Sequence, residues 1–100
     1  MLVELSVVPI GVGESLSEYV AEALKVIEGR GLKYELSSMG TVVELKDYRE
    51  LGELMQEIND RLVERGAGRV YMVVKVDYRL RGGSIEGKKK SVEEKLRRSP

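Results

Sequence analysis

Hydroxyl groups gather in one segment of the sequence, Ser37-Ser38-Met39-Gly40-Thr41. A hydroxyl both donates and accepts hydrogen bonds, so three of them beside exposed backbone suit the polar edge of a heteroaromatic ring. A methionine side chain can lie against the face of such a ring. A four- or five-residue hairpin turn with its glycine in the left-handed conformation explains the same residues. The segment alone leaves both interpretations open.

Two other segments carry groups that suit a charged ligand. Residues 9–13, Pro-Ile-Gly-Val-Gly, precede a predicted helix whose first backbone amides could hold an anion. A flexible strand-to-helix turn explains them as well, and we prefer it. Lys75, Asp77 and Arg79 share one face at strand spacing. Such charges are usually solvated or paired across strands, but at an oligomer interface they can fix the register or bind a charged ligand.

Composition limits the chemistry that these groups can do. The 100 residues include no histidine and no cysteine, which argues against the usual zinc sites and against Ser-His or Cys-His nucleophiles. We therefore expect no metal and no cofactor. Carboxylates, lysines, tyrosines and hydroxyls remain, so catalysis is not excluded, but its commonest apparatus is missing. Lysine plus arginine equals aspartate plus glutamate, 17 against 17, which argues against a nucleic-acid partner. The sequence shows neither an apolar run of the roughly 20 residues that span a membrane nor a signal peptide. We expect a cytoplasmic protein without membrane contact.

Hydrophobic patterns predict a single domain, residues 1–100, built from alternating strands and helices. Period-two alternation predicts strands at residues 2–9, 33–37, 41–46 and 69–79. Pro9 is expected to end the first strand. Helical stripes predict one helix opened by a capping box at Ser15 and Glu18, and another from Asp47 to Gly66. A glycine-rich linker then leads to a short helical extension within residues 88–98, opened by Ser91, which must dock or fray.

The order strand–helix–strand–strand–helix–strand is that of the ferredoxin-like βαββαβ sandwich. We expect an α+β fold, in which a four-stranded antiparallel sheet carries two helices on one face. The helix-covered face takes the apolar strand positions: Val3, Leu5, Val7, Tyr34, Leu36, Val43, Leu45, Val70, Met72, Val74 and Val76. The opposite face mixes charges with valines: Glu4, Ser6, Val8, Glu35, Ser37, Val42, Glu44, Tyr71, Val73, Lys75, Asp77 and Arg79. An ordinary exposed face is usually more polar, so the mixture favours a ligand surface or a homo-oligomer.

Several stretches together resemble the thiamine-binding-protein-like family of small conserved cytoplasmic proteins. The resemblance covers nearly the whole chain. It rests on Pro9-Ile10-Gly11 with Gly13, Ser17 and Tyr19-Val20, on Tyr34 through Met39-Gly40-Thr41, and on Lys75, Asp77 and Arg79. The sequence departs from the family pattern at Leu45, which follows Glu44 where the family commonly has glycine.

The resemblance implies a non-catalytic protein that binds thiamine or its hydroxymethylpyrimidine part. It also implies tetramers, formed as dimers of dimers through the sheets. Hydroxyls and backbone groups can satisfy an aminopyrimidine edge, while a carboxylate can bind a protonated ring nitrogen and Tyr71 can stack. The expected ligand-binding residues are Ser6, Ser37, Ser38, Met39, Gly40, Thr41, Glu44, Tyr71 and Asp77.

Three other functions are compatible with this fold. An oligomeric structural or regulatory protein with no small-molecule ligand would use the same mixed face. An RNA-binding sheet would stack bases on aromatic residues of its central strands, and the chain has neither phenylalanine nor tryptophan. An acylphosphatase-like enzyme would rest on analogy of fold alone.

Overall fold

A computed structural model describes residues 1–13 and 16–98 of the chain, and it has the expected α+β architecture. Ser15, which was expected to cap the first helix, lies outside the described residues. The elements follow one another as β1 (Leu2–Ile10), α1 (Ser17–Gly29), β2 (Tyr34–Leu36), β3 (Thr41–Glu44), α2 (Tyr48–Glu64), β4 (Arg69–Asp77) and α3 (Ile85–Arg98).

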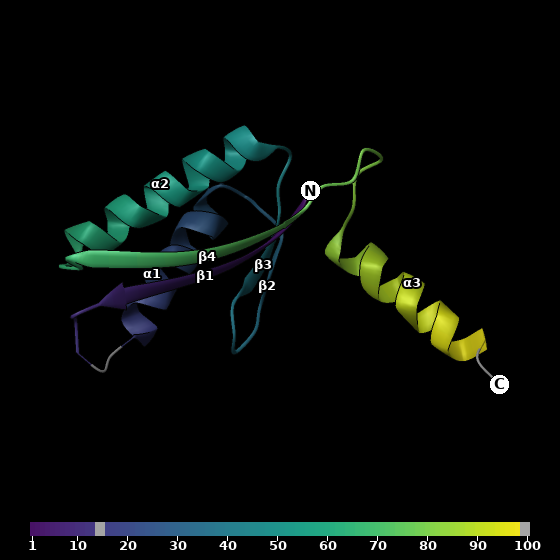
Figure 1. The fold of residues 1–100 in the computed structure, drawn as a ribbon, viewed down its shortest axis with the longest axis horizontal. Helices are drawn as coiled ribbons and strands as arrows, with labels where there is room; N and C mark the ends of the chain where they lie inside the picture. The colour runs from purple at the N-terminus through teal and green to yellow at the C-terminus, as the bar shows by residue number, and fades with distance from the viewer. Residues whose placement is uncertain (14–15, 99–100) are drawn as a thin grey trace.

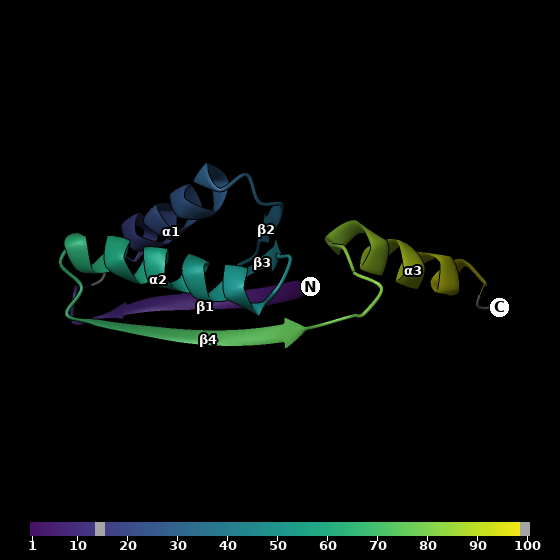
Figure 2. The same cartoon turned by 90° about the horizontal axis from the view of Figure 1, so that it is seen from above.

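The four strands form one antiparallel sheet in the order β2-β3-β1-β4, the arrangement of the ferredoxin-like fold. Helices α1 and α2 cover one face of this sheet, and the other face is open (Figures 1 and 2). The long strands β1 and β4 pair along their whole length, from Leu2 opposite Asp77 to Ile10 opposite Arg69. Helix α3 extends away from the sheet and the other two helices (Figure 1).

The core lies between the sheet and the two covering helices. Its least exposed side chains come from β1, α1, β3 and α2: Val3, Val26, Ile27, Val43, Leu54, Ile58 and Leu62. Two positions expected on the covered face are exceptions, since Leu36 is 53% exposed and Val76 is 36% exposed. Leu36 lies near the end of a three-residue strand at the sheet edge, where the helices no longer cover it.

The start of α2 and the C-terminal ends of both helices follow the expected capping chemistry, whereas α1 begins after Leu16, whose side chain makes no capping hydrogen bond. Asp47 accepts a hydrogen bond from the backbone of Glu50 at 2.9 Å, and Glu50 in turn accepts one from the backbone of Lys46 at 3.0 Å. Gly31 and Gly66 lie just beyond the two helices at φ of 68° and 110°, the left-handed region that glycine adopts without strain. Helix α2 therefore begins and ends, and helix α1 ends, where the sequence indicates.

A buried carboxylate joins α1 to α2. Glu22 is 6% exposed, and its carboxylate binds Lys25 at 3.3 Å, Arg61 at 3.2 Å and Arg65 at 3.7 Å. Burial by itself would raise the pKa of Glu22. The hydrogen bonds and charges of these three cations outweigh burial and hold its pKa below the ordinary value. The cluster fixes the position of α1, which also forms one wall of the cavity described below.

Several expected boundaries are wrong. Strands β2, β3 and β4 are shorter than the expected residues 33–37, 41–46 and 69–79. Strand β1 continues through Pro9 to Ile10, because β3 pairs with β1 only as far as Leu5. Beyond that point one side of β1 has no neighbouring strand, so a missing N–H is tolerated there. Helix α3 begins at Ile85 rather than Ser91. The hydroxyl of Ser84 accepts a hydrogen bond from the backbone of Gly87 at 2.9 Å, so the helix is capped seven residues before the expected Ser91.

Candidate ligand-binding site

A cavity of about 190 Å³ lies at the tip of the β2–β3 hairpin. It exists because the strands differ in length: β1 has nine residues and β3 has four, so the second half of β1 runs on without a neighbour on that side. The first turns of α1 cross this gap. The residues that line the cavity are Leu5, Ser6, Val7, Val8, Leu16, Val20, Ala23, Leu24, Ile27, Leu36, Ser37, Ser38, Met39, Gly40 and Thr41.

The hairpin turn holds its own shape through Ser37. The hydroxyl of Ser37 donates to the carbonyl oxygen of Gly40 at 2.9 Å and accepts from the backbone of Met39 at 3.4 Å. The backbone N–H of Ser37 donates to the same carbonyl oxygen at 2.9 Å. This arrangement presents the next two side chains outward, and Met39 is 83% exposed. The turn is thus a fixed wall of the cavity.

Gly40 has a different role from the expected one. It is absent from the glycines with positive φ in the described chain, so the turn does not need a left-handed residue at this position. A Cβ atom at residue 40 would lie 3.2 Å from the carbonyl oxygen of Leu5 and 3.4 Å from a side-chain carbon of Glu4. Glycine is needed because the hairpin approaches the backbone of β1 this closely.

Thr41 is the least exposed hydroxyl-bearing residue at the cavity, at 8% exposure. It opens β3 opposite Leu5 of β1 and Leu36 of β2, and its neighbour on the same side of β3 is the buried Val43. Its side chain therefore faces the helix-covered side of the sheet. A ligand group that met this hydroxyl would do so away from bulk water.

The cavity has one polar side and one apolar side. Residues 37–41 supply hydroxyls and turn backbone, while α1 and β1 supply aliphatic side chains. All the described residues that line the cavity are uncharged. Sites that bury a drug-sized ligand usually measure about 300–1,000 Å³. A cavity of about 190 Å³ is therefore large enough for one small ring with hydrogen-bonding edges.

Six of the nine expected site residues line this cavity: Ser6, Ser37, Ser38, Met39, Gly40 and Thr41. The other three lie elsewhere. The carboxylate of Glu44 accepts a hydrogen bond from the backbone of Ile85 at 2.8 Å. Asp77 forms an ion pair with Lys88. Tyr71 lies on β4 opposite Val8 and is 53% exposed. Ligand contact by these three remains a prediction.

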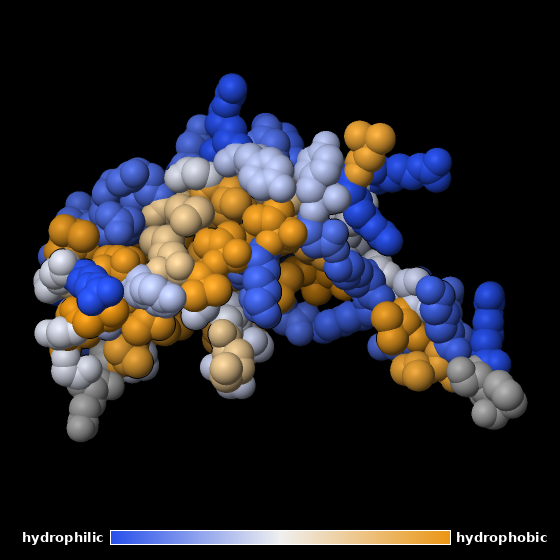
Figure 3. All heavy atoms as spheres, in the orientation of Figure 1, coloured by the Kyte–Doolittle hydropathy of each residue, from blue (hydrophilic) through white to orange (hydrophobic). Residues whose placement is uncertain are grey.

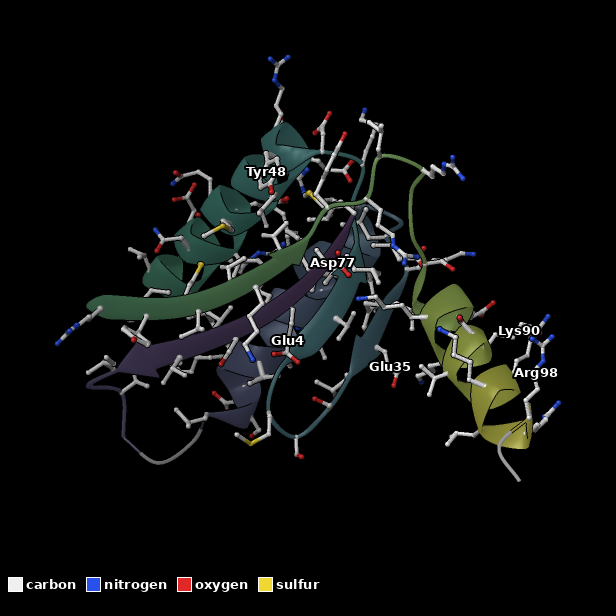
Figure 4. The ribbon with its side chains drawn as sticks, turned by 45° about the vertical axis from the view of Figure 1, so that its right-hand side comes forward. Glu4, Glu35, Tyr48, Asp77, Lys90 and Arg98 are labelled. Atoms are coloured by element: carbon white, nitrogen blue, oxygen red, sulfur yellow. The ribbon has the colours of Figure 1, made fainter. Side chains whose placement is uncertain are left out.

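Glu44 and Asp77, the two carboxylates expected at the ligand, are engaged by α3. The hydrogen bond and charge of Lys88 hold the pKa of Asp77 below its ordinary value. Figure 4 shows Asp77 and Glu35 on the side of the sheet from which α3 departs. Among the described residues, no group of three or more acidic side chains is arranged to hold a metal ion.

The sequence did not identify the wall contributed by α1. Leu16 and Val20 begin the apolar stripe that predicts the first helix, and this stripe was expected to face the sheet. In the structure they are 42% and 37% exposed and face the cavity. The sequence held one signal for this wall. Leu16 and Val20 stand at the start of the stripe, beside β1 residues that have a neighbouring strand on one side only. Using this signal requires the register of β3 against β1, which the sequence pattern does not give.

Together the fold and the cavity define a class of molecule, a small ferredoxin-like α+β protein with a ring-sized site beside its second hairpin. Comparison with known proteins places it more narrowly. Residues 3–93 match the family model described as thiamine-binding protein. The chain belongs to this family.

Relatives and solved structures agree with that assignment. A UPF0045 protein of Methanothermobacter thermautotrophicus is 37% identical over 95 residues, covering 93% of this chain and 96% of the relative. A structure from Methanocaldococcus jannaschii superposes with a TM-score of 0.79 at 35% identity, over 93% of this chain and 95% of the other. A Thermotoga maritima protein, provisionally named for thiamine biosynthesis or salvage, gives a TM-score of 0.75 at 28% identity, over 91% and 96%.

No helix in the described part of the chain combines the length and the apolar character that crossing a bilayer requires.

Proposed function

We propose that this chain binds thiamine or its hydroxymethylpyrimidine part in the cavity at the tip of the β2–β3 hairpin, without turnover. One observation carries the proposal. Six residues that were expected at a ligand site from the sequence line a single cavity in the structure. Membership of the thiamine-binding protein family supports the same class of ligand.

The pyrimidine ring suits the cavity better than the thiazolium ring does. The pyrimidine is flat, neutral and edged with an amino donor and nitrogen acceptors, which hydroxyls and turn backbone can satisfy. The thiazolium carries a permanent positive charge, and burying a charge among uncharged groups is costly. We therefore place the pyrimidine inside, against Thr41, and the thiazolium end at the mouth near the exposed Met39.

Binding without chemistry is consistent with the described lining. Its polar groups are hydroxyls and backbone amides, and the hydroxyl of Ser37 is already bonded within the turn. A hydroxyl becomes an effective nucleophile only with an adjacent base. The described lining residues supply hydrogen bonds and apolar contact, which are the requirements for holding a ring.

We further propose that the protein acts as a homo-oligomer, a tetramer made as a dimer of dimers. The open face of the sheet, as seen in Figure 3, carries apolar side chains in its middle with charged ones around them. Val8, Tyr71 and Val73 contribute, with 37%, 53% and 44% exposure. The same surface would equally serve an oligomeric structural or regulatory protein with no small-molecule ligand, so the ligand itself must be tested.

Isothermal titration calorimetry tests the ligand. Hydroxymethylpyrimidine and thiamine are each titrated into the full chain, with hydroxyethylthiazole, methylated on its ring nitrogen so that it carries the permanent charge, as a third ligand. We expect the two pyrimidine-containing ligands to bind and the thiazole not to bind. Heat from the thiazole alone, with none from hydroxymethylpyrimidine, would contradict the placement of the ring. No heat from any of the three would favour the structural or regulatory function.

A further inference from the structure

Helix α3 has no cover within a single chain. Its 14 residues include none that is buried, and Val92 and Leu96 are 57% and 68% exposed. The chain has a radius of gyration of 15.4 Å, above the roughly 13 Å of a compact 100-residue domain, because α3 extends outward. Isolated helices of about 12–15 residues are marginal in water. The helix therefore needs a surface on which to pack.

The first turns of α3 are held at the rim of the open face. The backbone of Ile85 donates to Glu44, Lys88 pairs with Asp77, and Nζ of Lys89 lies 2.6 Å from Glu35. These three acids belong to β3, β4 and β2. They fix where the helix starts, and the rest of α3 projects beyond the sheet, with Lys90 and Arg98 on its outer side (Figure 4).

The apolar residues of α3 form one stripe. Ile85, Val92 and Leu96 are separated by seven and four residues, which places them on the same side of a helix. In Figure 3 the apolar atoms of α3 appear on the same side of the molecule as those of the open sheet face. One partner surface can therefore meet both at once.

The charges of α3 and of the remaining chain are opposite. Six of the 17 basic residues and three of the 17 acidic ones lie within α3, which gives the helix a formal charge of +3 and leaves −3 on the other residues. Of the acids on the open face and its rim, Glu35, Glu44 and Asp77 contact the first turns of the same chain's α3, and Glu4 lies 3.6 Å from Lys75, so the complementarity lies in the net charges of the two parts. Such complementarity steers association and fixes the orientation of partners.

We propose that α3 is an arm exchanged between copies of this chain: its stripe of Ile85, Val92 and Leu96 packs on the open sheet face of a second copy, which returns its own α3. Each copy carries both an uncovered helix and an uncovered face, and the two match in apolar character and charge. A two-fold arrangement covers both α3 helices and both open sheet faces. The contacts that fix the start of α3 direct it away from its own sheet, so a second copy is the occupant. This inference does not depend on the ligand.

A pair of single substitutions on opposite sides of α3 tests the arm. Leu96→Glu places a carboxylate in the stripe, and Ser91→Glu places one on the other side of the same helix as a matched control. The mass of the full chain is measured by light scattering across micromolar concentrations, against 11.2 kDa for one copy. We expect wild type and Ser91→Glu to show the same multiple of that mass. We expect Leu96→Glu to fall to a smaller multiple, with an association constant reduced at least tenfold.

Cysteine cross-linking identifies the contact itself, because the chain contains no cysteine of its own. Chains with Val92→Cys are mixed with chains with Val73→Cys and oxidised. Each chain carries one cysteine, so every link joins two copies. We expect the mixed pair to link preferentially, and the same mixture with Ser91→Cys in place of Val92→Cys to link weakly.

Several results would overturn the proposal. Wild type could be monomeric at these concentrations, or Leu96→Glu could keep the full mass. Val92→Cys could link only to itself, which would mean that two α3 helices meet each other instead of the sheet. Finally, wild type could be monomeric and sediment with anionic phospholipid vesicles, while Leu96→Glu does not sediment with them. That result would assign the stripe to a membrane surface. None of these results bears on whether the cavity binds a pyrimidine.

Discussion

Thr41 offers the sharpest test of the proposed site, because one atom can be changed while the shape is kept. We expect Thr41→Val to weaken binding of hydroxymethylpyrimidine and to leave the fold intact. Valine has the size and the strand preference of threonine, and it replaces only the hydroxyl with a methyl group. Thr41 opens β3 and pairs with Leu5 of β1 on one side and Leu36 of β2 on the other, and valine suits such a strand position as threonine does.

The size of the effect follows from burial. Thr41 is 8% exposed, so a ligand group that loses its hydroxyl partner there cannot readily turn to water instead. An unpaired buried polar group costs about 1–3 kcal/mol, which corresponds to a roughly 5- to 150-fold loss of affinity, since about 1.4 kcal/mol is tenfold.

Calorimetry on wild type, Thr41→Val and Thr41→Ser measures this effect. Serine keeps the hydroxyl and removes the methyl group, so Thr41→Ser should retain most of the affinity that Thr41→Val loses. Ser91→Ala removes a hydroxyl from α3 and serves as the control for a change far from the cavity. Equal affinities for wild type and Thr41→Val, at the same oligomeric state, would falsify the role assigned to Thr41 and leave residues 37–41 as a turn only.

Three further predictions concern the framework. Gly40→Ala should lower the free energy of unfolding by about 1–3 kcal/mol in a urea titration, because its Cβ would meet the carbonyl of Leu5 at 3.2 Å. Gly52→Ala, with open space around its Cβ inside α2, should instead raise it by up to about 1 kcal/mol; equal effects would refute the close-approach argument. Asp47→Ala removes the side chain that caps α2 and should lower the free energy of unfolding by about 0.5–2 kcal/mol in the same titration. Because the pKa of Glu22 is lowered in the folded state, its stabilisation is present above the ordinary value of 4.5 and is lost as pH falls through the lower folded value. The difference in unfolding free energy between wild type and Glu22→Gln should therefore shrink on acidification; a constant difference would argue against this cluster.

The element order could be predicted because local signals agree with one another along the chain. The alternation in β1 and β4, the stripe of α2 and the glycine at residue 66 all indicate the same architecture, and the structure confirms it. Boundaries were less secure where tertiary context decides. Pro9 is acceptable inside β1 only because β3 is too short to reach it, and no pattern within residues 2–10 reveals that.

The candidate site could be predicted in part. Residues 37–41 carry their hydroxyls in the sequence, and their place beside β1 follows from the fold. The cavity itself arises from the difference in length between β1 and β3, a property of two segments some 30 residues apart. Glu44 and Asp77 were expected at the ligand because they share the open face. Their engagement by α3 depends on that helix starting at Ile85, where Ser84 caps it.

Ligand binding and assembly meet at Ser6 and Val8. Both alternate with Leu5 and Val7 along β1 and so belong to the open face, yet both line the cavity. A second copy lying over the open face would cover this rim, so ligand and partner would stabilise the same arrangement. Binding linkage is reciprocal, and such coupling is typically about 1–3 kcal/mol, or roughly 5- to 150-fold in affinity.

Saturating hydroxymethylpyrimidine should therefore shift dissociation of the oligomer to lower protein concentration, as measured by light scattering on dilution. Thr41→Val at the same ligand concentration should show a smaller shift, because its occupancy is lower, while its dissociation without ligand should match wild type. Identical dilution curves for saturated and ligand-free wild type would show that the partner does not cover the rim formed by Ser6 and Val8. That result would not contradict the cavity as a ligand site or the open face as an interface, because each has its own direct test. It would show that ligand binding and assembly are not coupled.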